Sequence, residues 1–230
     1  MITVQTNYPV AVDSDDHKHP EGIYYDNNLN EDFVRSVEEH FKRKISILDL
    51  GCAGGELITH MHKKGNKAVG LEGSDHCLNI RPEMIEEVGF PPAGQHNWKE
   101  FGNVILFTCD VTKEYSIFEN NKLLQFDLIT CFDVIEHFKD EDLDLYFNMV
   151  DKHLLPGGLF VNSIHRSESY RHVGSKNTPE KLNYHKSMHN REWWEQKLSE
   201  HFVIAEFPFS HSNRGHPKGH DDLFACKKKV

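Results

Sequence analysis

The chain is acidic and of single-domain size: its 230 residues include 36 Asp and Glu against 26 Lys and Arg, for a formal net charge of −10 at pH 7. This length can bury one large core, and the negative charge disfavours a nucleic-acid partner, whose phosphates the surface would repel. The histidine content is high at 17 residues, and imidazoles titrate close to neutral pH. Some of these histidines are therefore candidates for a functional role.

The cysteines and the apolar runs bear on the cellular compartment. The 5 cysteines are widely spaced and form no C-x-x-C pair, which excludes a disulfide framework and a thiolate metal site. The first residues lack a basic region followed by an apolar run, so we expect no signal peptide. No run approaches the ~18 apolar residues of a membrane span. We therefore expect a cytoplasmic protein without a membrane partner.

The N-terminal part of the chain is polar and contains Pro9 and Pro20. We expect an N-terminal arm over residues 1–28, followed by one domain over residues 29–230. From Asn30 the apolar residues recur at helical spacing, with acidic side chains in the first turn and basic ones in the last, which predicts an amphipathic helix. Its apolar positions are Phe33, Val34, Val37 and Phe41.

Short apolar runs then alternate with helical patterns. The strands are nearly continuous apolar segments, which is typical of a parallel sheet covered on both faces. In such sheets ligands bind at the carboxyl ends of the strands. The predicted strands are 45–50, 67–71, 104–109, 126–131 and 159–164, and the predicted helices open at 56 and cover about 75–88 and 140–153.

The pattern changes towards the C-terminus. A predicted helix over 191–201 precedes two strands, 202–207 and 222–226, with no helix between them, which indicates an antiparallel hairpin at the sheet edge. Two connections, residues 89–103 and 166–190, are longer than usual in a compact domain and are interpreted as acceptor-side insertions.

A glycine-rich loop joins the first strand to its helix. Gly51, Cys52, Ala53 and Gly55 would let a ligand approach the backbone at a helix N-terminus. Glu56 occupies the third glycine position of the dinucleotide pattern, where a carboxylate would oppose a pyrophosphate. Asp49 adds a negative charge just before the loop. The loop is therefore predicted to bind a cationic ligand.

Two further carboxylates end the next strands. Glu72 follows Asp49 at the distance at which nucleotide-binding folds place the acceptor for ribose hydroxyls. Asp110 ends the third strand and could accept a hydrogen bond from an adenine amine. Together the three carboxylates indicate an adenosyl group with a cationic amino-acid tail.

With these motifs the sequence resembles the class I S-adenosylmethionine-dependent methyltransferases, closely over about residues 33–164. The resemblance implies a Rossmann-like, doubly wound α/β sandwich with a seven-stranded, mostly parallel sheet, and S-adenosylmethionine as cofactor. Ala53 departs from the family, which most often has a second glycine there. The matching segments are 47–55, 70–74, 109–111, 126–137 and 154–158, and the cofactor-binding residues so implied are Asp49, Gly51, Cys52, Ala53, Gly55, Glu72, Gly73, Asp110, Val111 and Phe132.

Three residues are candidates for catalysis on the acceptor side. Transfer to a hydroxyl requires a base that takes its proton, whereas an amine or a thiol needs less help. His165 directly follows the fifth strand and is the preferred base, with His137 as a second candidate. Asp133 follows the fourth strand and could contact the acceptor or the methionine amine, or else cap a helix. The alternative for His137 is a packed or solvent-bound side chain, which is the more frequent case for a histidine at a helix start.

The remaining histidines and tryptophans have weaker signals. His185 and His189 are spaced as two metal ligands on a helix would be, but without a carboxylate in register, so no metal site is predicted. The histidines within 211–220 are interpreted as a surface hairpin. Of Trp193 and Trp194, one is expected in the core and one at the surface.

These features favour a methyltransferase acting on a hydroxyl of a small polar molecule or glycan, because the acceptor-side loops are polar and rich in histidine. A nucleic-acid or protein methyltransferase is the alternative, although the signature of amino-methylating DNA enzymes is missing after the fourth strand, where residues 131–134 read Cys-Phe-Asp-Val. A non-catalytic cofactor-binding scaffold is the third possibility. The acceptor, the atom methylated, the oligomeric state and whether a divalent ion assists stay open.

Overall fold

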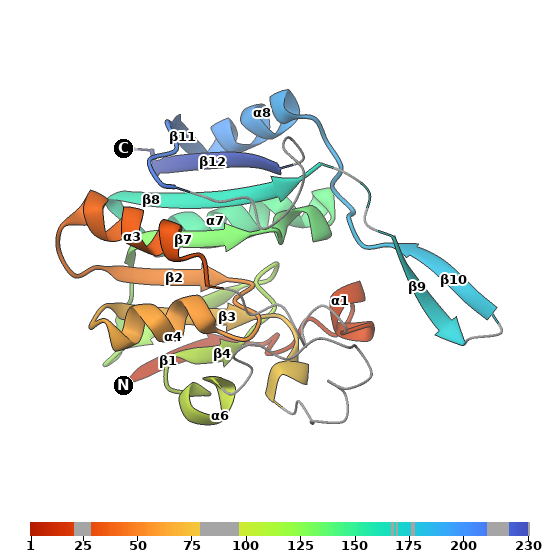
Figure 1. The fold of residues 1–230 in the computed structure, drawn as a ribbon, viewed down its shortest axis with the longest axis horizontal. Coiled ribbons are helices and arrows are strands. Elements are labelled where there is room, and N and C mark those ends of the chain that lie inside the picture. The colour runs from red at the N-terminus through yellow and green to blue at the C-terminus, as the bar shows by residue number, and fades with distance from the viewer. Residues whose placement is uncertain are drawn as a thin grey trace.

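The central feature is a seven-stranded sheet with the order β11-β12-β8-β7-β2-β3-β4. The computed structural model describes residues 1–20, 29–78, 97–166, 168, 170–175, 178–210 and 221–229. Strands β8, β7, β2, β3 and β4 are parallel, and β12 is antiparallel to both β8 and β11. The predicted doubly wound sheet with an antiparallel C-terminal edge is confirmed (Figure 1). The strands are β2 (Ser46–Leu50), β3 (Lys67–Glu72), β4 (Leu106–Thr108), β7 (Phe126–Phe132), β8 (Leu154–His165), β11 (Phe202–Ala205) and β12 (Asp221–Lys228).

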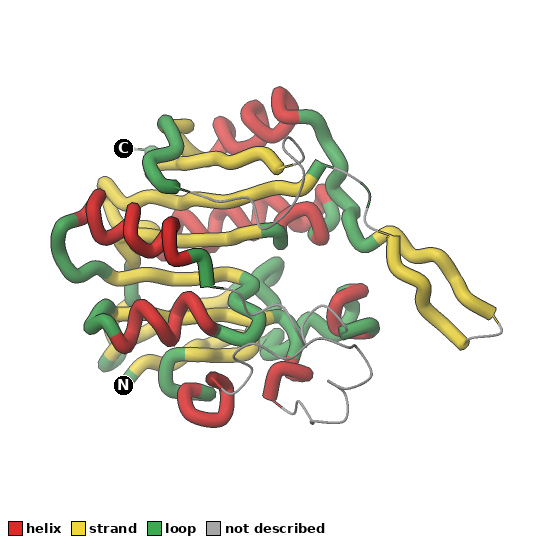
Figure 2. The backbone as a smooth tube through the Cα atoms, viewed as in Figure 1, coloured by secondary structure: helices red, strands yellow, loops and turns green. Residues whose placement is uncertain are grey.

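Helices cover both faces of the sheet (Figure 2). Neighbouring residues of β2 point to opposite faces, so Ile47 packs with the first helical layer and Leu48 with the second. The first layer buries Phe33 of α3 and Met61 of α4, and the second buries Trp194 of α8. The helices are α3 (Glu31–Phe41), α4 (Glu56–Lys63), α7 (Leu143–His153) and α8 (Arg191–His201).

Side-chain caps explain where two of these helices begin. The Asn30 side chain accepts the Phe33 N–H at 3.0 Å, and the Asn190 side chain accepts the Trp193 N–H at 2.9 Å. Each bond satisfies a backbone donor that has no partner within the first helical turn. Local sequence therefore determines both helix starts.

The N-terminal residues are more ordered than the polar arm expected from the sequence. Strand β1 (Ile2–Thr6) pairs antiparallel with β5 (Tyr115–Glu119), which also pairs with β6 (Lys122–Leu123) in a separate three-stranded sheet. Helix α1 (Asp15–Lys18) follows. No element is predicted for these segments from the sequence alone, because β1 has only Ile2 and Val4 packed on the core and its pairing partner lies far away in the sequence.

The two long connections contain their own elements. Strands β9 (Tyr170–Ser175) and β10 (Thr178–Asn183) form an antiparallel hairpin that extends away from the sheet (Figure 1). Helix α6 (Asn97–Phe101) ends the other connection, whose residues 89–96 lie outside the described part. The predicted helix over 75–88 begins as the 3₁₀ turn η1 (Asp75–Leu78), and its remaining positions from 79 are also outside the described residues. Two further 3₁₀ turns, η2 (Ile135–His137) and η3 (Asp140–Asp142), precede α7.

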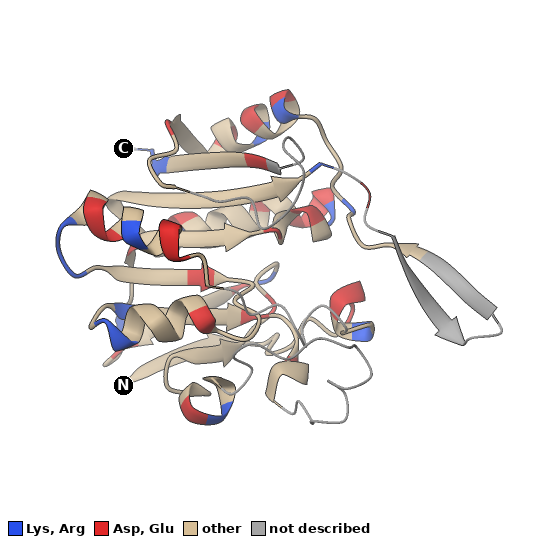
Figure 3. Ribbon diagram, viewed as in Figure 1, with Lys and Arg blue, Asp and Glu red and all other residues tan. Residues whose placement is uncertain are grey.

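Figure 3 shows acidic and basic positions together on the helices α3, α4 and α8, none of which is basic along its length. Among the described residues, none of the helices combines the length and apolar character needed to cross a bilayer. The division of the chain at residue 28 into an arm and a domain stays a prediction.

Candidate active site

The carboxyl ends of the parallel strands meet at one edge of the sheet, and the predicted site residues gather there. The glycine loop follows β2, Glu72 ends β3, and Asp110 lies just beyond β4. Asp133 and His137 follow β7, and His165 ends β8. We call the β2–β4 end the cofactor side and the β7–β8 end the acceptor side.

The glycine loop is tightly turned and is packed against the acceptor side. Gly51 and Gly55 have φ of +75° and +80°, a region that favours glycine. A Cβ on Gly51 would lie 2.4 Å from Cγ2 of Val134, in the loop after β7. Ala53 is also left-handed, at φ 44°. Close packing against Val134 therefore requires the first glycine, in addition to any approach of a ligand to the backbone.

Two buried carboxylates flank this loop. Asp49 is 8% exposed, and its Oδ1 accepts the Thr130 hydroxyl at 2.6 Å. Glu72, equally exposed at 8%, accepts the N–H of Ala53 at 2.9 Å through Oε2 and the N–H of Ser74 at 3.0 Å through Oε1. A carboxylate oxygen can accept more than one hydrogen bond, so Glu72 retains acceptor capacity for two hydroxyls.

The environment of Glu72 changes its acidity. Burial raises its pKa to about 7, and the neighbouring Asp16 acts in the same direction, while the hydrogen bonds from Ser74 and Ala53 oppose the shift. A hydroxyl donor bound here would favour the ionised form. The carboxylate is therefore suited to a ligand that brings donors, such as a ribose diol.

The other predicted cofactor residues differ in burial and in their contacts. Asp110 accepts the N–H and the hydroxyl of Thr112 through Oδ1, and its Oδ2 contacts no donor among the described residues. Val111 is 5% exposed and belongs to the core. Phe132 is half-buried and meets Phe33 edge-on, with ring centroids 5.1 Å apart. Cys52 is buried, and burial raises the pKa of its thiol, which makes it unreactive.

A segment that the sequence did not connect with the site lies across this edge. Residues 7–20, here called the N-terminal strap, contact both the cofactor side and the acceptor side. At the cofactor side Ala11 donates its N–H to the Gly73 carbonyl at 2.7 Å, and a Cβ on Gly73 would lie 3.2 Å from that of Ala11. The Tyr8 carbonyl accepts the N–H of Asp110 at 2.9 Å.

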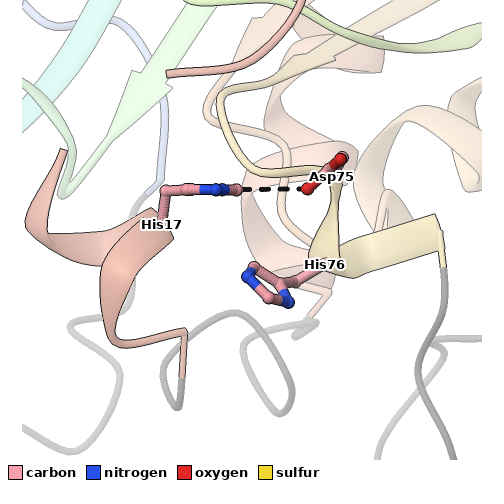
Figure 4. A group of neighbouring side chains, drawn as sticks. All are labelled: His17, Asp75 and His76. Carbon is pink, nitrogen blue, oxygen red and sulfur yellow. Dashed lines mark ion pairs between the residues drawn. The ribbon is translucent and has the colours of Figure 1, made fainter. Parts of the chain in front are cut away.

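Helix α1 of the strap continues these contacts. Nδ1 of His17 lies 3.2 Å from the Ser74 hydroxyl and 3.8 Å from a carboxylate oxygen of Asp75, and His76 lies beside the pair (Figure 4). Further along, Asp16 reaches Nδ1 of His137 at 2.7 Å, and Asp15 pairs with Lys186. The strap therefore joins the two sides of the edge.

The acceptor side brings together titratable groups from three segments. The ring of His185 lies between those of His137 and His165, with centroid separations of 4.9 and 5.3 Å. Glu136 is fully buried, and its Oε1 accepts the His165 N–H at 3.0 Å. Burial raises the pKa of Glu136 to about 8, which favours its protonated form near neutral pH.

Asp133 lies at the start of this group. It adopts a left-handed backbone with φ 55°, and its Oδ1 accepts the Ser163 hydroxyl at 2.5 Å. Its side chain does not cap η2, whose preceding residue is Val134 and which has no side-chain cap. The alternative interpretation of Asp133 as a helix cap is therefore wrong.

The spacing of His185 and His189 would suit two metal ligands on a helix, but residues 184–190 contain no helix. His185 is buried in the acceptor side, whereas His189 stacks on Trp193 at 3.6 Å and bonds to Asp140. Trp194 is fully buried, as expected for one of the two tryptophans. The histidines at 211, 216 and 220 lie outside the described residues.

Comparison with known proteins decides the family. The family model described as "Methyltransferase domain" matches residues 24–211. The chain belongs to this methyltransferase family. The cofactor of the methyltransferase is S-adenosylmethionine, as its sequence motifs imply.

Two curated relatives carry the name ubiquinone biosynthesis O-methyltransferase. The one from Agrobacterium fabrum is 26% identical over 150 residues, covering 63% of this chain and 51% of the relative. The one from Chelativorans sp. is 32% identical over 124 residues, covering 54% of this chain and 42% of the relative. The matched part of the methyltransferase thus spans about half the length of these relatives or less.

A solved structure supports the fold. The S-adenosylmethionine-dependent methyltransferase from Clostridium acetobutylicum aligns with 93% of this chain and 98% of its own, at a TM-score of 0.56 and 17% identity. At this identity the similarity concerns the fold alone. The expected Rossmann-like methyltransferase architecture is confirmed.

Sequence reasoning missed three contributors to the site. Glu136 stood next to a candidate base but was not considered by itself. His185 was considered only for its spacing to His189, and the strap was interpreted as an arm. The sequence signal for Glu136 was available, because an acidic residue inside an otherwise apolar run after β7 is buried only if it has a partner or a ligand.

Proposed function

We propose that this methyltransferase transfers a methyl group to a hydroxyl of a small polar molecule, sugars and glycans included. The observation that carries the proposal is the convergence of His137, His165 and His185 with the buried Glu136 at the acceptor side. An apolar acceptor would require an apolar lining, whereas a hydroxyl requires hydrogen-bonding partners and a base. The names of the two curated relatives agree with oxygen as the accepting atom.

On the cofactor side, the proposal assigns the binding of S-adenosylmethionine to residues around the glycine loop. Glu72 accepts the ribose hydroxyls, for which its two oxygens keep acceptor capacity. Asp49 supplies negative charge for the cationic end of the cofactor, and Oδ2 of Asp110 accepts from the adenine amine. The full set is Asp49, Gly51, Cys52, Ala53, Gly55, Glu72, Gly73, Asp110, Val111 and Phe132, with Val111 acting through packing because it is buried in the core.

On the acceptor side, His165 takes the proton. S-adenosylmethionine supplies a methyl group activated by its sulfonium. The acceptor oxygen forms the new bond to the methyl carbon while the electron pair of the carbon–sulfur bond stays with sulfur, and the hydroxyl proton passes to His165. His137 and Asp133 line the same space and position the acceptor. The chain's main task is to align the two reacting atoms and to exclude water.

A methyl-transfer screen tests this function. The purified chain is incubated with labelled S-adenosylmethionine and a panel of phenols, sugars and hydroxylated metabolites, with matched amine and thiol analogues. Transfer to a hydroxyl compound, reduced in His165→Ala and Asp133→Ala, is expected. Transfer to the amines or thiols alone would contradict the proposed acceptor, and full activity in both variants would contradict the proposed roles.

A further inference from the structure

Three metal-binding side chains meet at the acceptor side. A carboxylate oxygen of Glu136 and one ring nitrogen each of His137 and His185 all lie within 4.8 Å of one another. Glu136 is fully buried, and His185 is 7% exposed. The three residues come from two segments, η2 after β7 and the connection after β10, which the fold brings together.

Glu136 has an oxygen whose hydrogen-bonding capacity is not used. Its Oε1 accepts the His165 N–H, and its backbone carbonyl accepts the N–H groups of Lys186 and Ser187 at 2.7 and 3.1 Å. Its Oε2 is buried and has no hydrogen-bond partner within the described part of the chain. Leaving a buried acceptor unsatisfied is destabilising, so such an atom calls for an explanation. A ligand bound by this carboxylate supplies one.

Neighbouring contacts hold the side chains of this cluster in place, as a metal site requires. The two backbone bonds from Lys186 and Ser187 to Glu136 hold the segment that carries His185 against η2. Asp16 of the strap lies 2.7 Å from Nδ1 of His137. A carboxylate close to a histidine ring is common beside histidines that bind a metal, and helps to orient them.

The donor set determines the class of ion. Two imidazoles and a carboxylate suit Zn²⁺, Mn²⁺ or Co²⁺, whereas Mg²⁺ and Ca²⁺ prefer oxygen ligands only. Ligands about 2.1 Å from a tetrahedral ion are about 3.4 Å apart, so side-chain movements of about 1 Å would close the cluster around one ion.

A second cluster, formed by His17, Asp75 and His76, is less suitable. These three groups also lie within 4.8 Å of one another. Figure 4 shows His17 facing Asp75, with His76 beside them. However, the Asp75 side chain is 49% exposed, and His17 is already bonded to Ser74. No buried acceptor is left without a partner in this cluster among the described residues.

We propose that Glu136, His137 and His185 form a binding site for one divalent transition-metal ion at the acceptor side. This revises the expectation from sequence that the chain has no metal ligands. Resting on the proposed function, the ion would also coordinate the acceptor oxygen and make its hydroxyl more acidic, so that His165 removes the proton more easily. Binding of the ion itself does not depend on that function.

Titration of the metal-free full chain tests the site. The protein is dialysed against EDTA and then against buffer, and is titrated with Co²⁺ followed by visible absorption and with Zn²⁺ followed by calorimetry. We expect one ion per chain at micromolar concentration. Glu136→Gln and His185→Ala should each weaken binding at least tenfold. The five buried cysteines do not compete for the ion in the folded chain.

Matched controls locate the ion. His189→Ala removes a histidine of the same connection that bonds to Asp140 instead, and should leave binding unchanged. His76→Ala tests the second cluster, and alanine at His211, His216 and His220 tests the remaining histidine-rich segment. The thermal midpoint and S-adenosylmethionine binding of each variant, measured without metal, show that it is folded.

The outcomes separate this proposal from the proposed function. Absence of binding at 1:1 stoichiometry, or binding that survives both Glu136→Gln and His185→Ala and is lost in a control variant, would overturn the metal site. Metal binding without transfer to any hydroxyl would support the site and contradict the proposed function. Transfer to a hydroxyl in a chain unable to bind metal would support the proposed function and contradict the metal site.

Discussion

The two sides of the strand edge are built in different ways. On the cofactor side, Asp49, Glu72 and Asp110 each lie at the end of a strand or directly after it, where the strand itself places them. Glu72 bonds to Ala53 and Ser74, and Asp110 bonds to Thr112, whereas Asp49 reaches Thr130 on the neighbouring strand β7. On the acceptor side, the bonding partners come from segments far apart in the sequence, such as Glu136 with His165 and His137 with Asp16.

This difference separates a part that short local motifs can build from a part that depends on how distant segments meet. A strand followed by a turn fixes the direction of the next side chain, so a short motif can form a cofactor site in any protein of this fold. Specificity for an acceptor requires groups from several loops. Substitutions on the cofactor side should therefore change the affinity for S-adenosylmethionine, and substitutions on the acceptor side should change transfer to the acceptor.

The largest effect is expected for His165→Ala. Loss of a general base lowers kcat by about 10²–10⁴-fold, while the affinity for S-adenosylmethionine should stay within about twofold, because His165 lies on the other side of the edge. Steady-state kinetics on the acceptor found by the screen, together with calorimetry, measures both. His189→Ala is the control. A parallel loss of cofactor affinity in His165→Ala would show that the two sides are not independent.

Glu72→Gln should mainly weaken the binding of S-adenosylmethionine. Replacing the carboxylate removes a charged acceptor for the ribose hydroxyls. The expected loss of binding free energy is about 2–3 kcal/mol, which raises the Kd for S-adenosylmethionine about 30–150-fold. Calorimetry measures this Kd. Glu119→Gln, which alters a surface pair with Lys67, should leave it unchanged. An unchanged Kd in Glu72→Gln would remove Glu72 from the cofactor site.

The pH dependence of stability should also report on Glu72. Its pKa is about 7 in the folded chain, above the ordinary value of 4.5, so between these values the native state binds more protons than the unfolded state. The stabilisation is complete below about pH 4.5 and is lost as the pH rises through 7.

Chemical unfolding without cofactor can measure this dependence. Relative to Glu72→Gln, the free energy of unfolding of the wild type should fall between pH 5 and 7, by up to about 1.4 kcal/mol per pH unit. Because both proteins share every other titrating group, their difference isolates Glu72. A constant or rising difference over this range would contradict the assigned shift.

The smallest effect is expected for Asp16→Asn in the strap. Asp16 contacts His137 and raises the pKa of Glu72, so its substitution should change both cofactor affinity and acceptor KM, each by up to about fivefold, as a partly exposed ion pair allows. Asp13→Asn, at a fully exposed side chain of the same strap, is the control. An effect on only one of the two constants would mean that the strap does not join the two sides.

Much of the fold could be predicted from the sequence. The apolar runs at β2, β3 and β7 and the helical patterns that follow Asn30 and Asn190 are local signals, and the structure confirms the elements that they predict. Strand β1 and the hairpin of β9 and β10 were missed. They are short segments with weak patterns whose pairing, in the case of β1 with β5, is decided by contacts distant in sequence.

The sequence by itself determined the strand-end carboxylates and the glycine loop, because the period of a strand and the turn that follows it set the direction of each side chain within a few residues. Only the tertiary structure decided that Glu136 is buried beside His185, that Asp16 reaches His137, and that Val134 packs on Gly51. Those contacts depend on how distant segments close around a shared core. Part of the high histidine content is thus explained by the acceptor side, where His137, His165 and His185 meet.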